Sequence, residues 1–577
     1  MRRLLVVLIF VVGGYGPAGA SGGAYASEEE GPLQDVLRER IEALRYAPQG
    51  HVQRDVTTLR AVEHLAAFYE MRSFAPVWVT PTHQRMTTYA LRAALRQAED
   101  EGLRMADYHL DAMNETLQAL RTAGPDERRT LLIDLELICS DAFLQYAGHL
   151  LGGRLDPQQL IPSWNIEARA TDLLDSFQAL SNGQAVHEAL QSLRPQHAEY
   201  DALRAALARY RRIADAGGWP SIAEGPTLDR GMEDERVAQL RARLAVTDGV
   251  ASVPDSLQPV FDAPLDEAVR AFQQRHGLTA DGRVGPATRA ALNVPVETRI
   301  NQLVVNLERW RWLPNDLGRR YVLVNIASFD LQVVEEGETV LEMPVVVGRS
   351  YRQTPVFSDE ISYLVLSPYW HVPHSIATRD KLPEFQRDPS AAARQGFQIF
   401  QGWSTQAQPI DPMTIDWDAL SARNFPYRLR QNPGPNNALG TVKFMFPNPY
   451  SVYLHDTPAR QLFGRDTRDF SSGCIRVARP LDLAEYLLRD NSGWDRATIE
   501  RNMGRSDERT VVLNERVPVH LLYWTAWAQS DGTVHFRDDV YNRDIDVQMA
   551  LAGRVTVPPA LHALLDSGNT PSVRTTP

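Results

Sequence analysis

The spacing of apolar residues along the 577-residue chain changes from a helical to a strand-like period at about residue 321. Between residues 30 and 230, apolar side chains recur every three or four positions, as at Leu33, Leu37 and Ile41, which is typical of amphipathic helices. From Tyr321 the period is two, which is typical of strands. The expected strands are residues 321–327, 331–334, 339–347 and 361–366. We therefore predict an α+β multidomain chain, in which a mostly β domain follows a helical part.

A small three-helix unit is expected between these parts, over residues 236–294. Val237, Leu240 and Leu244 fall on one face of its first helix. The second helix ends at Gly277, and Gly285-Pro286 opens the third. His276, at the close of the second helix, is expected at the surface.

The strand pattern is lost between Ser375 and Tyr427 and returns after it. A stretch this long inside a compact domain is often a lid over a binding site. A surface insertion without order is the alternative. Near the end of the chain, residues 510–513, 517–527 and 533–536 again have strand character, and disorder is expected after Ser567.

The N-terminus has the pattern of a secretory signal. Arg2-Arg3 precedes an apolar run over residues 4–12, and Ala24-Tyr25-Ala26 fits a cleavage site. The run is shorter than the ~20 residues that span a bilayer, so cleavage is preferred to an uncleaved membrane anchor. Cleavage after Ala20 is the other possible position. We therefore expect a mature chain from about Ser27, exported to the periplasm.

Charge argues against a nucleic-acid partner. Sixty basic and 72 acidic side chains give a net charge of −12, whereas phosphate binding needs a basic field.

The chain has two cysteines, and in an exported protein a pair usually suggests a disulfide. Cys139, however, lies in an apolar run with helical spacing, and we expect it to be a small core residue.

The second cysteine lies in a pattern that favours nucleophilic catalysis. Cys474 follows Ser471-Ser472-Gly473 and lies nineteen positions after His455. A thiol attacks as its thiolate, so it needs a nearby base and backbone N–H groups that receive the oxyanion. His455 is the candidate base, and Arg476 adds a cation. The alternative is a buried cysteine beside an incidental histidine.

Four ordered motifs resemble the L,D-transpeptidase family. They are residues 432–440, 443–448, 452–458 and 471–476. The resemblance is to the YkuD-type catalytic domain, in the large, scaffold-bearing, YcbB-like branch. Many members have Ser-His-Gly-Cys where this chain has Ser-Ser-Gly-Cys, but the family's base is the upstream histidine, matched here by His455. Residues 277–292 resemble a peptidoglycan-binding domain of the three-helix type, which can also act as a spacer.

The resemblance implies a division of the chain into five parts. They are a signal peptide (1–26), a helical scaffold domain (27–235), a peptidoglycan-binding domain (236–294), a catalytic domain (295–502) with a capping lid at about 375–427, and a C-terminal segment (503–577) that packs with the scaffold and ends in a disordered tail.

The resemblance also implies a reaction. Cys474 would attack the third residue of a tetrapeptide stem of peptidoglycan, and His455 would take and return the proton. D-alanine would leave, and an amine from a neighbouring stem would form a 3-3 cross-link. Water as acceptor would give a carboxypeptidase or wall peptide hydrolase instead. Carbapenems would acylate the same cysteine. A wall-anchoring protein without catalysis is the third possibility.

Site roles are expected as follows. The amides of Gly473 and Cys474 are candidates for the oxyanion hole, and a main-chain carbonyl would orient His455. The expected substrate-binding residues are Arg476, Tyr453, Ser472 and Trp370. Arg476 would bind a stem-peptide carboxylate, or form an ion pair that holds the turn. The expected partners are stem peptides and glycan strands, with other wall-synthesis enzymes left open, and a monomer is expected.

A metal site is not expected. His371 and His374 could form half of one, but Pro373 breaks the helix that usually sets such pairs, and no acidic or cysteine ligand follows at a suitable spacing. No cofactor is expected either.

Overall fold

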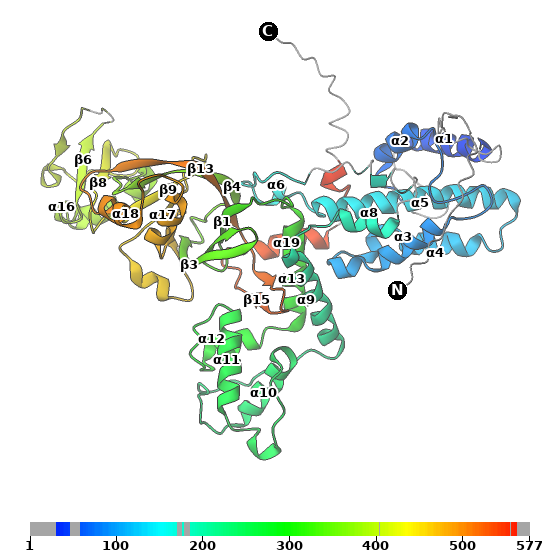
Figure 1. Cartoon of the computed structure of the whole chain (residues 1–577), viewed down its shortest axis with the longest axis horizontal. Coiled ribbons are helices and arrows are strands. Elements are labelled where there is room, and N and C mark those ends of the chain that lie inside the picture. The colour runs from blue at the N-terminus through cyan, green and yellow to red at the C-terminus, as the bar shows by residue number, and fades with distance from the viewer. Residues whose placement is uncertain are drawn as a thin grey trace, which may run out of the picture. The chain divides into compact units, whose positions relative to one another are not determined.

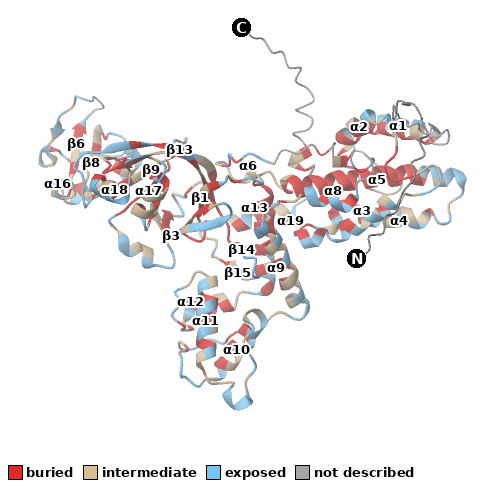
Figure 2. Ribbon diagram, in the orientation of Figure 1, coloured by how far each residue is buried: buried red, intermediate tan, exposed pale blue. Residues whose placement is uncertain are grey.

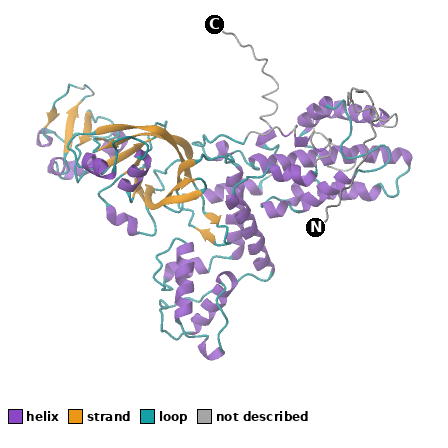
Figure 3. Ribbon diagram, in the orientation of Figure 1, coloured by secondary structure: helices purple, strands orange, loops and turns teal. Residues whose placement is uncertain are grey.

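The computed structural model describes residues 31–46, 58–169, 185–402, 406–553 and 556–561, with Leu173, Ser176, Phe177, Leu180 and Ser404. The expected signal peptide and the tail after Ser567 lie outside the described residues. The fold is multidomain, with helical regions and one β-rich region, as predicted (Figure 3). Within the described residues, no helix is both long and apolar enough to cross a membrane.

The chain divides into two compact units, residues 1–88 with 112–140 and residues 89–111 with 141–577. Among the described residues, the α-helices before the small unit are α1 (Gly31–Tyr46), α2 (Val62–Met71), α3 (Met86–Arg96), α4 (Leu110–Ala119), α5 (Pro125–Gly152), α6 (Pro157–Leu160), α8 (Val186–Ser192) and α9 (Ala198–Asp215). Every residue of α5 from 131 to 151 is buried (Figure 2). Its buried side chains include polar and charged groups, such as Glu136 and Asp141, besides the apolar ones. Cys139 lies there as a buried free thiol, as predicted, and no disulfide joins it to Cys474.

The small unit forms as its sequence predicts. Its helices are α10 (Glu235–Asp248), α11 (Ala263–Arg275) and α12 (Pro286–Leu292), shown in green in Figure 1. Asp262 caps α11 by accepting the Leu265 N–H, and Pro286 occupies the first turn of α12. Leu244, Val269 and Leu292 belong to its separate apolar core.

His276, which was expected at the surface, is half-buried. Its ring stacks on Phe272 at 3.8 Å between centroids, and Phe536 lies 5.7 Å away on another segment. Phe536, which the sequence pattern did not place near α11, covers part of the His276 ring.

The β-rich region is built on a nine-stranded sheet with the order β11-β3-β12-β10-β9-β4-β13-β1-β2. Its strands are β1 (Arg320–Asn325), β2 (Asp330–Glu335), β3 (Glu338–Gly348), β4 (Phe357–Leu366), β9 (Val442–Met445), β10 (Leu454–His455), β11 (Asp469–Ser471), β12 (Ile475–Val477) and β13 (Arg509–Leu522). Helices α13 (Val296–Arg311), α17 (Pro480–Leu488) and α18 (Arg496–Met503) belong to the same region. The strands expected from period two are confirmed, with small shifts of their ends.

The sheet continues past residue 502, where we expected the catalytic domain to end. Strand β13 lies between β4 and β1, paired antiparallel with the first and parallel with the second. The boundary was therefore placed too early. Two separate strands were expected here because the apolar pattern breaks at residues 514–516, where the structure has only a register shift between Val512 and Val517.

The insertion is a folded subdomain rather than a segment without order. It carries a four-stranded sheet, β5-β8-β6-β7, and its own apolar core. Its elements are β5 (Trp370–His371), α14 (His374–Ile376), a π-helix (Ala377–Lys381), α15 (Leu382–Arg387), α16 (Ser390–Arg394), β6 (Phe397–Gln401), β7 (Pro409–Ile410) and β8 (Tyr427–Gln431). Because β5 pairs with β8, the subdomain spans 370–431, wider than the expected 375–427.

The C-terminal segment holds a hairpin of β14 (Ala526–Ala528) and β15 (Val534–Phe536), followed by α19 (Arg543–Ala552). Arg104 and Arg154 both donate to the carbonyl of Gly553, at 3.1 and 2.8 Å. The segment thus contacts residues that precede the small unit.

Candidate active site

Strand register brings the predicted site residues to one face of the sheet. Strands β10 and β12 run parallel with Leu454 beside Ile475 and His455 beside Arg476. Leu454 and Ile475 are fully buried in the main core. Because side chains alternate along a strand, Tyr453, His455, Cys474 and Arg476 belong to the opposite face. Lys443 joins this face, since β9 pairs it with His455 while the neighbouring Phe444 enters the core.

Cys474 follows a turn that other residues hold in place. Gly473 has φ +118°, a conformation that side-chain-bearing residues rarely adopt. Its carbonyl accepts a hydrogen bond from Thr354 Oγ1 at 2.9 Å, and its N–H donates to Ser471 Oγ at 3.1 Å. The Ser471 hydroxyl in turn donates to the carbonyl of Cys474 at 2.5 Å. In the described part of the chain, the Cys474 N–H has no acceptor, whereas the Gly473 N–H is already occupied.

His455 is 4% exposed and is oriented by the main chain. Its Nδ1 lies 2.5 Å from the carbonyl oxygen of Asp456, which can only accept, so Nδ1 carries the hydrogen and Nε2 keeps its lone pair. Burial, and then the positive charge of Arg476, lower the pKa of His455 to about 3. The imidazole is therefore a neutral base at ordinary pH.

The carboxylate of Asp456 serves the turn rather than the imidazole. It accepts the Thr441 N–H at 2.8 Å and the Thr457 N–H at 2.6 Å, and it pairs with Arg460. A methyl group at Gly440 would meet this carboxylate at 2.3 Å, so only glycine fits there.

The thiol of Cys474 is also neutral at rest. Burial raises its pKa, while hydrogen bonding to Tyr453 and the charges of Arg476 and Lys443 act in the opposite direction. Sγ lies 3.7 Å from the carbonyl oxygen of Ser451. The arrangement places a neutral thiol and a neutral imidazole on one face of neighbouring strands, so the base must remove the proton as attack occurs.

Arg476 does not hold the turn by an ion pair. Among the described residues its guanidinium has no hydrogen-bond or ion-pair partner, and its Nε is buried without an acceptor. Burial lowers the pKa of Arg476. The ordinary pKa of arginine is so high that the guanidinium still stays charged. A half-buried, unpartnered cation beside a nucleophile is a binding group for an anion.

Ser472 and Trp370 occupy different places. Ser472 Oγ accepts from Arg352 Nη1 at 2.8 Å, and Arg352 also pairs with Asp380 of the insertion at 2.6 Å. Trp370 belongs to the core of the insertion, although it lines a cavity together with Arg476. Sequence reasoning missed Arg352, Thr354 and Lys381. It also missed Lys443, although this residue had a signal, because it stands in the motif over residues 443–448.

The described residues contain no group of three or more histidine, cysteine, aspartate or glutamate side chains that could hold a metal ion. His371 and His374 therefore gain no further ligand in this part of the chain.

Three regions of the chain match known protein families. Residues 319–513 match the L,D-transpeptidase catalytic domain (YkuD), residues 233–292 match a "Putative peptidoglycan binding domain", and residues 63–207 match a scaffold domain. The chain thus contains a YkuD-type L,D-transpeptidase catalytic domain, a peptidoglycan-binding domain and a scaffold domain. All the site residues named above lie within the first of these matches.

Two curated relatives are similar over part of their length. A "Putative L,D-transpeptidase" from Haemophilus influenzae is 35% identical over 255 residues, covering 44% of this chain and 50% of the relative. The N-acetylmuramoyl-L-alanine amidase CwlM from Mycobacterium tuberculosis is 39% identical over 80 residues, covering 13% of this chain and 20% of the relative. The chain thus spans half or less of the length of these relatives.

Two solved structures were also similar. An L,D-transpeptidase fragment from Xylanimonas cellulosilytica shares 15% identity, with 52% of this chain and 98% of that chain covered and a TM-score of 0.17. An L,D-transpeptidase from Stackebrandtia nassauensis shares 13% identity, with 52% and 96% covered and a TM-score of 0.20. TM-scores this low carry no argument about the fold.

Proposed function

We propose that the protein is a peptidoglycan L,D-transpeptidase that forms 3-3 cross-links through a thioester on Cys474. The observation that carries this proposal is the shared sheet face of Cys474, His455 and the unpartnered Arg476, within the matched catalytic domain. A nucleophile, a neutral base and an anion-binding group are the parts that transfer of a peptide acyl group requires.

The reaction proceeds in two halves. His455 Nε2 takes the thiol proton as Sγ forms a bond to the carbonyl carbon of the third stem residue. The Cys474 N–H stabilises the oxyanion. The C–N bond to D-alanine breaks, and His455 returns the proton to the leaving amine. An amine from a second stem then attacks the thioester, gives its proton to His455, and the thiol is restored.

Substrate contacts are assigned on the same face. Tyr453 lies beside His455 at 5.7 Å between ring centroids and hydrogen-bonds with Cys474, so it lines the acyl site. Arg476 binds a carboxylate of the stem peptide. Ser472 acts through the turn, because its hydroxyl is held by Arg352.

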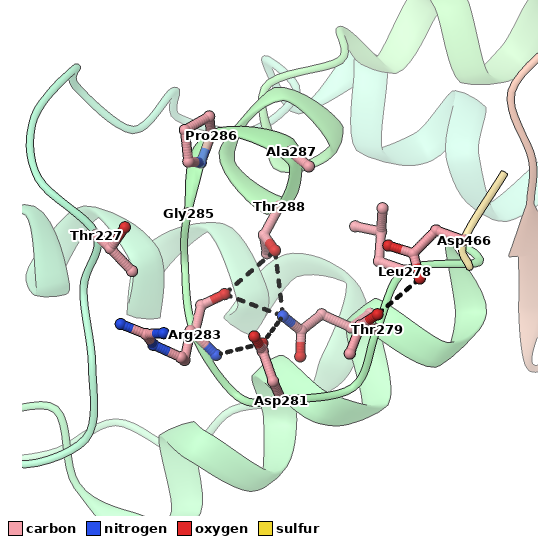
Figure 4. Close-up of a pocket in the computed structure, with 11 residues that line it drawn as sticks. Thr227, Leu278, Thr279, Asp281, Arg283, Gly285, Pro286, Ala287, Thr288 and Asp466 are labelled. Atoms are coloured by element: carbon pink, nitrogen blue, oxygen red, sulfur yellow. Dashed lines mark hydrogen bonds between the residues drawn. The ribbon is translucent and has the colours of Figure 1, made fainter. Parts of the chain in front are cut away.

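The small domain binds the wall in this proposal. Figure 4 shows an open polar pocket on it, with Thr279 donating to Asp466 at 2.7 Å and with Thr227 and Arg283 on the opposite side. Its volume is about 220 Å³. Peptidoglycan lies outside the cytoplasmic membrane, so the proposed location is the periplasm, reached through the N-terminal signal.

Incubation with tetrapeptide muropeptides tests the proposal. Cross-linked dimers and released D-alanine are expected by mass spectrometry, both absent in Cys474→Ala and strongly reduced in His455→Ala. Cys139→Ala is the matched control and should behave as wild type. Free tripeptides without dimers would identify a hydrolase instead.

A further inference from the structure

A cavity of about 220 Å³ lies between the insertion and residues that belong to or follow strands β10 and β12, next to the nucleophile. One wall comes from the insertion, through Trp370, Lys381 and Gln395. The other comes from the residues after His455, through Thr457, and from Arg476. Pockets that enclose a whole small molecule measure ~300–1,000 Å³, so this cavity accommodates one end of a larger substrate.

The charge of the cavity is positive. Lys381 and Arg476 both line it, and no aspartate or glutamate is among its lining residues. Glu384, outside the lining, forms an ion pair with Lys381 and accepts one of the three ammonium hydrogens at 2.9 Å, and Gln395 accepts another at 2.9 Å. The guanidinium of Arg476 has no partner among the described residues. N–H groups of Lys381 and Arg476 that have no acceptor favour the binding of an anion with several acceptor oxygens.

Lysine is rare in this chain. Only two of its 60 basic residues are lysines, and these are Lys381 in the cavity and Lys443 beside His455. A lysine presents a compact point charge, whereas arginine presents a planar fork. Lys381 and Arg476 therefore offer complementary donors from two sides of one small space.

The position of the cavity identifies which part of the substrate enters it. Arg476 pairs in register with His455, and Thr457 follows His455 by two residues. In the proposed reaction, His455 gives its proton to the amine of the leaving residue. The residue that carries this amine therefore lies on the cavity side, and its carboxylate is within reach of the cations.

We infer that this cavity is a carboxylate pocket for the residue on the leaving side of the scissile bond, and that Lys381 of the insertion is a specificity-determining residue. The inference rests on the proposed function. The insertion then does more than cover the site, because it supplies half of the recognition of the terminal carboxylate.

Matched donor peptides test the pocket. Tetrapeptides that end in a carboxylate and in a carboxamide differ only in the group that the pocket would bind. Wild type should prefer the carboxylate in kcat/KM by at least about tenfold, the scale of a hydrogen-bonded charge. Lys381→Met should remove most of this preference, and Lys381→Arg should restore part of it. Arg423→Met, an exposed residue of the insertion outside the cavity, should keep the full preference.

Binding without turnover provides the second measurement. In Cys474→Ala protein, calorimetry should show tighter binding of the carboxylate peptide, and Lys381→Met in that background should remove most of the difference. Alkylation of Cys474 by iodoacetamide should stay at the wild-type rate in Lys381→Met, which shows that the fold and the nucleophile are intact. An unchanged carboxylate preference in Lys381→Met would overturn the inference. Dimer formation by Cys474→Ala would instead overturn the proposed function.

Discussion

At the scale of single residues, the resting site holds two uncharged groups, the Cys474 thiol and the His455 imidazole. Burial raises the pKa of the thiol and lowers that of the imidazole to about 3. An ion pair of thiolate and imidazolium, which some cysteine enzymes use, would require shifts of the opposite sign.

The pH dependence of alkylation follows from these directions. Because a raised thiol pKa moves thiolate formation to higher pH, the rate of Cys474 alkylation by iodoacetamide should still rise above pH 8.5, the usual thiol range. Because the imidazole protonates only near pH 3, no acid step should appear near pH 6.5. Mass spectrometry of the labelled peptide provides the rate, and buried Cys139 is an internal reference that should react slowly. A plateau already reached at pH 6 would contradict the neutral pair.

Gly473→Ala tests the turn. At φ +118° a Cβ brings backbone strain of order 1–3 kcal/mol, although no atom lies closer than 3.9 Å to it. Relief of the strain would move the Cys474 N–H, so turnover should fall at least about tenfold. Gly464→Ala is the matched control, since a Cβ there meets nothing within 4 Å. Turnover equal to that of wild type in Gly473→Ala would show that the turn does not depend on this conformation.

At the scale of elements, Arg352 connects the insertion to the turn before the nucleophile. It donates to Asp380 in the π-helix and to Ser472 Oγ, while Thr354 of the same loop holds the Gly473 carbonyl. The insertion and the turn are therefore mechanically coupled through one guanidinium.

Loss of this connection should affect catalysis more than stability. Arg352→Met should lower kcat by about 10- to 100-fold, the effect of a small misplacement of reacting groups. A double-mutant cycle with Asp380→Asn should give a coupling energy of about 0.5–3 kcal/mol, as expected for residues in one network. Thermal unfolding should change little, because the Asp380 carboxylate is 36% exposed. Additive effects of the two substitutions on kcat would contradict the coupling.

The sequence predicted the strands of the catalytic region better than it predicted the long-range contacts of these strands and of the loops. Period two located β1 to β4, and the motifs located Cys474 and His455. Arg352 carried no signal, because it stands in a loop 120 residues before Ser472 and meets it only through the sheet. Lys381 was equally hidden, since the insertion lacks the alternation from which strands are recognised. Pairing of β13 with β4 joins segments some 150 residues apart, and no local pattern encodes such contacts.

At the scale of the whole molecule, the proposed role of the small domain is a second contact with the polymer substrate. Its three helices were predictable because their caps and apolar positions are local. The contact between Thr279 and Asp466 was not, since the two residues are 187 positions apart.

Wall binding and acyl transfer should separate in point variants. Arg283→Ala removes a pocket cation whose ion pair with Asp229 is half exposed, so stability should change by less than about 1 kcal/mol. Sedimentation with wall sacculi should weaken, while acylation by a carbapenem proceeds at the wild-type rate. Arg230→Ala, an exposed neighbour outside the pocket, is the control. Unchanged sedimentation in Arg283→Ala would indicate that this pocket does not hold the wall.

The proposed reaction passes through a covalent thioester between Cys474 and the third residue of a stem peptide. Intact-mass spectrometry of the protein, quenched in acid during turnover of a tetrapeptide donor, measures it directly. We predict one adduct per chain with the mass of the donor less D-alanine and a peptide map that places it on Cys474. The adduct should disappear on addition of an acceptor stem, as cross-linked product forms. Product formation without any adduct, or an adduct on Cys139, would contradict the account.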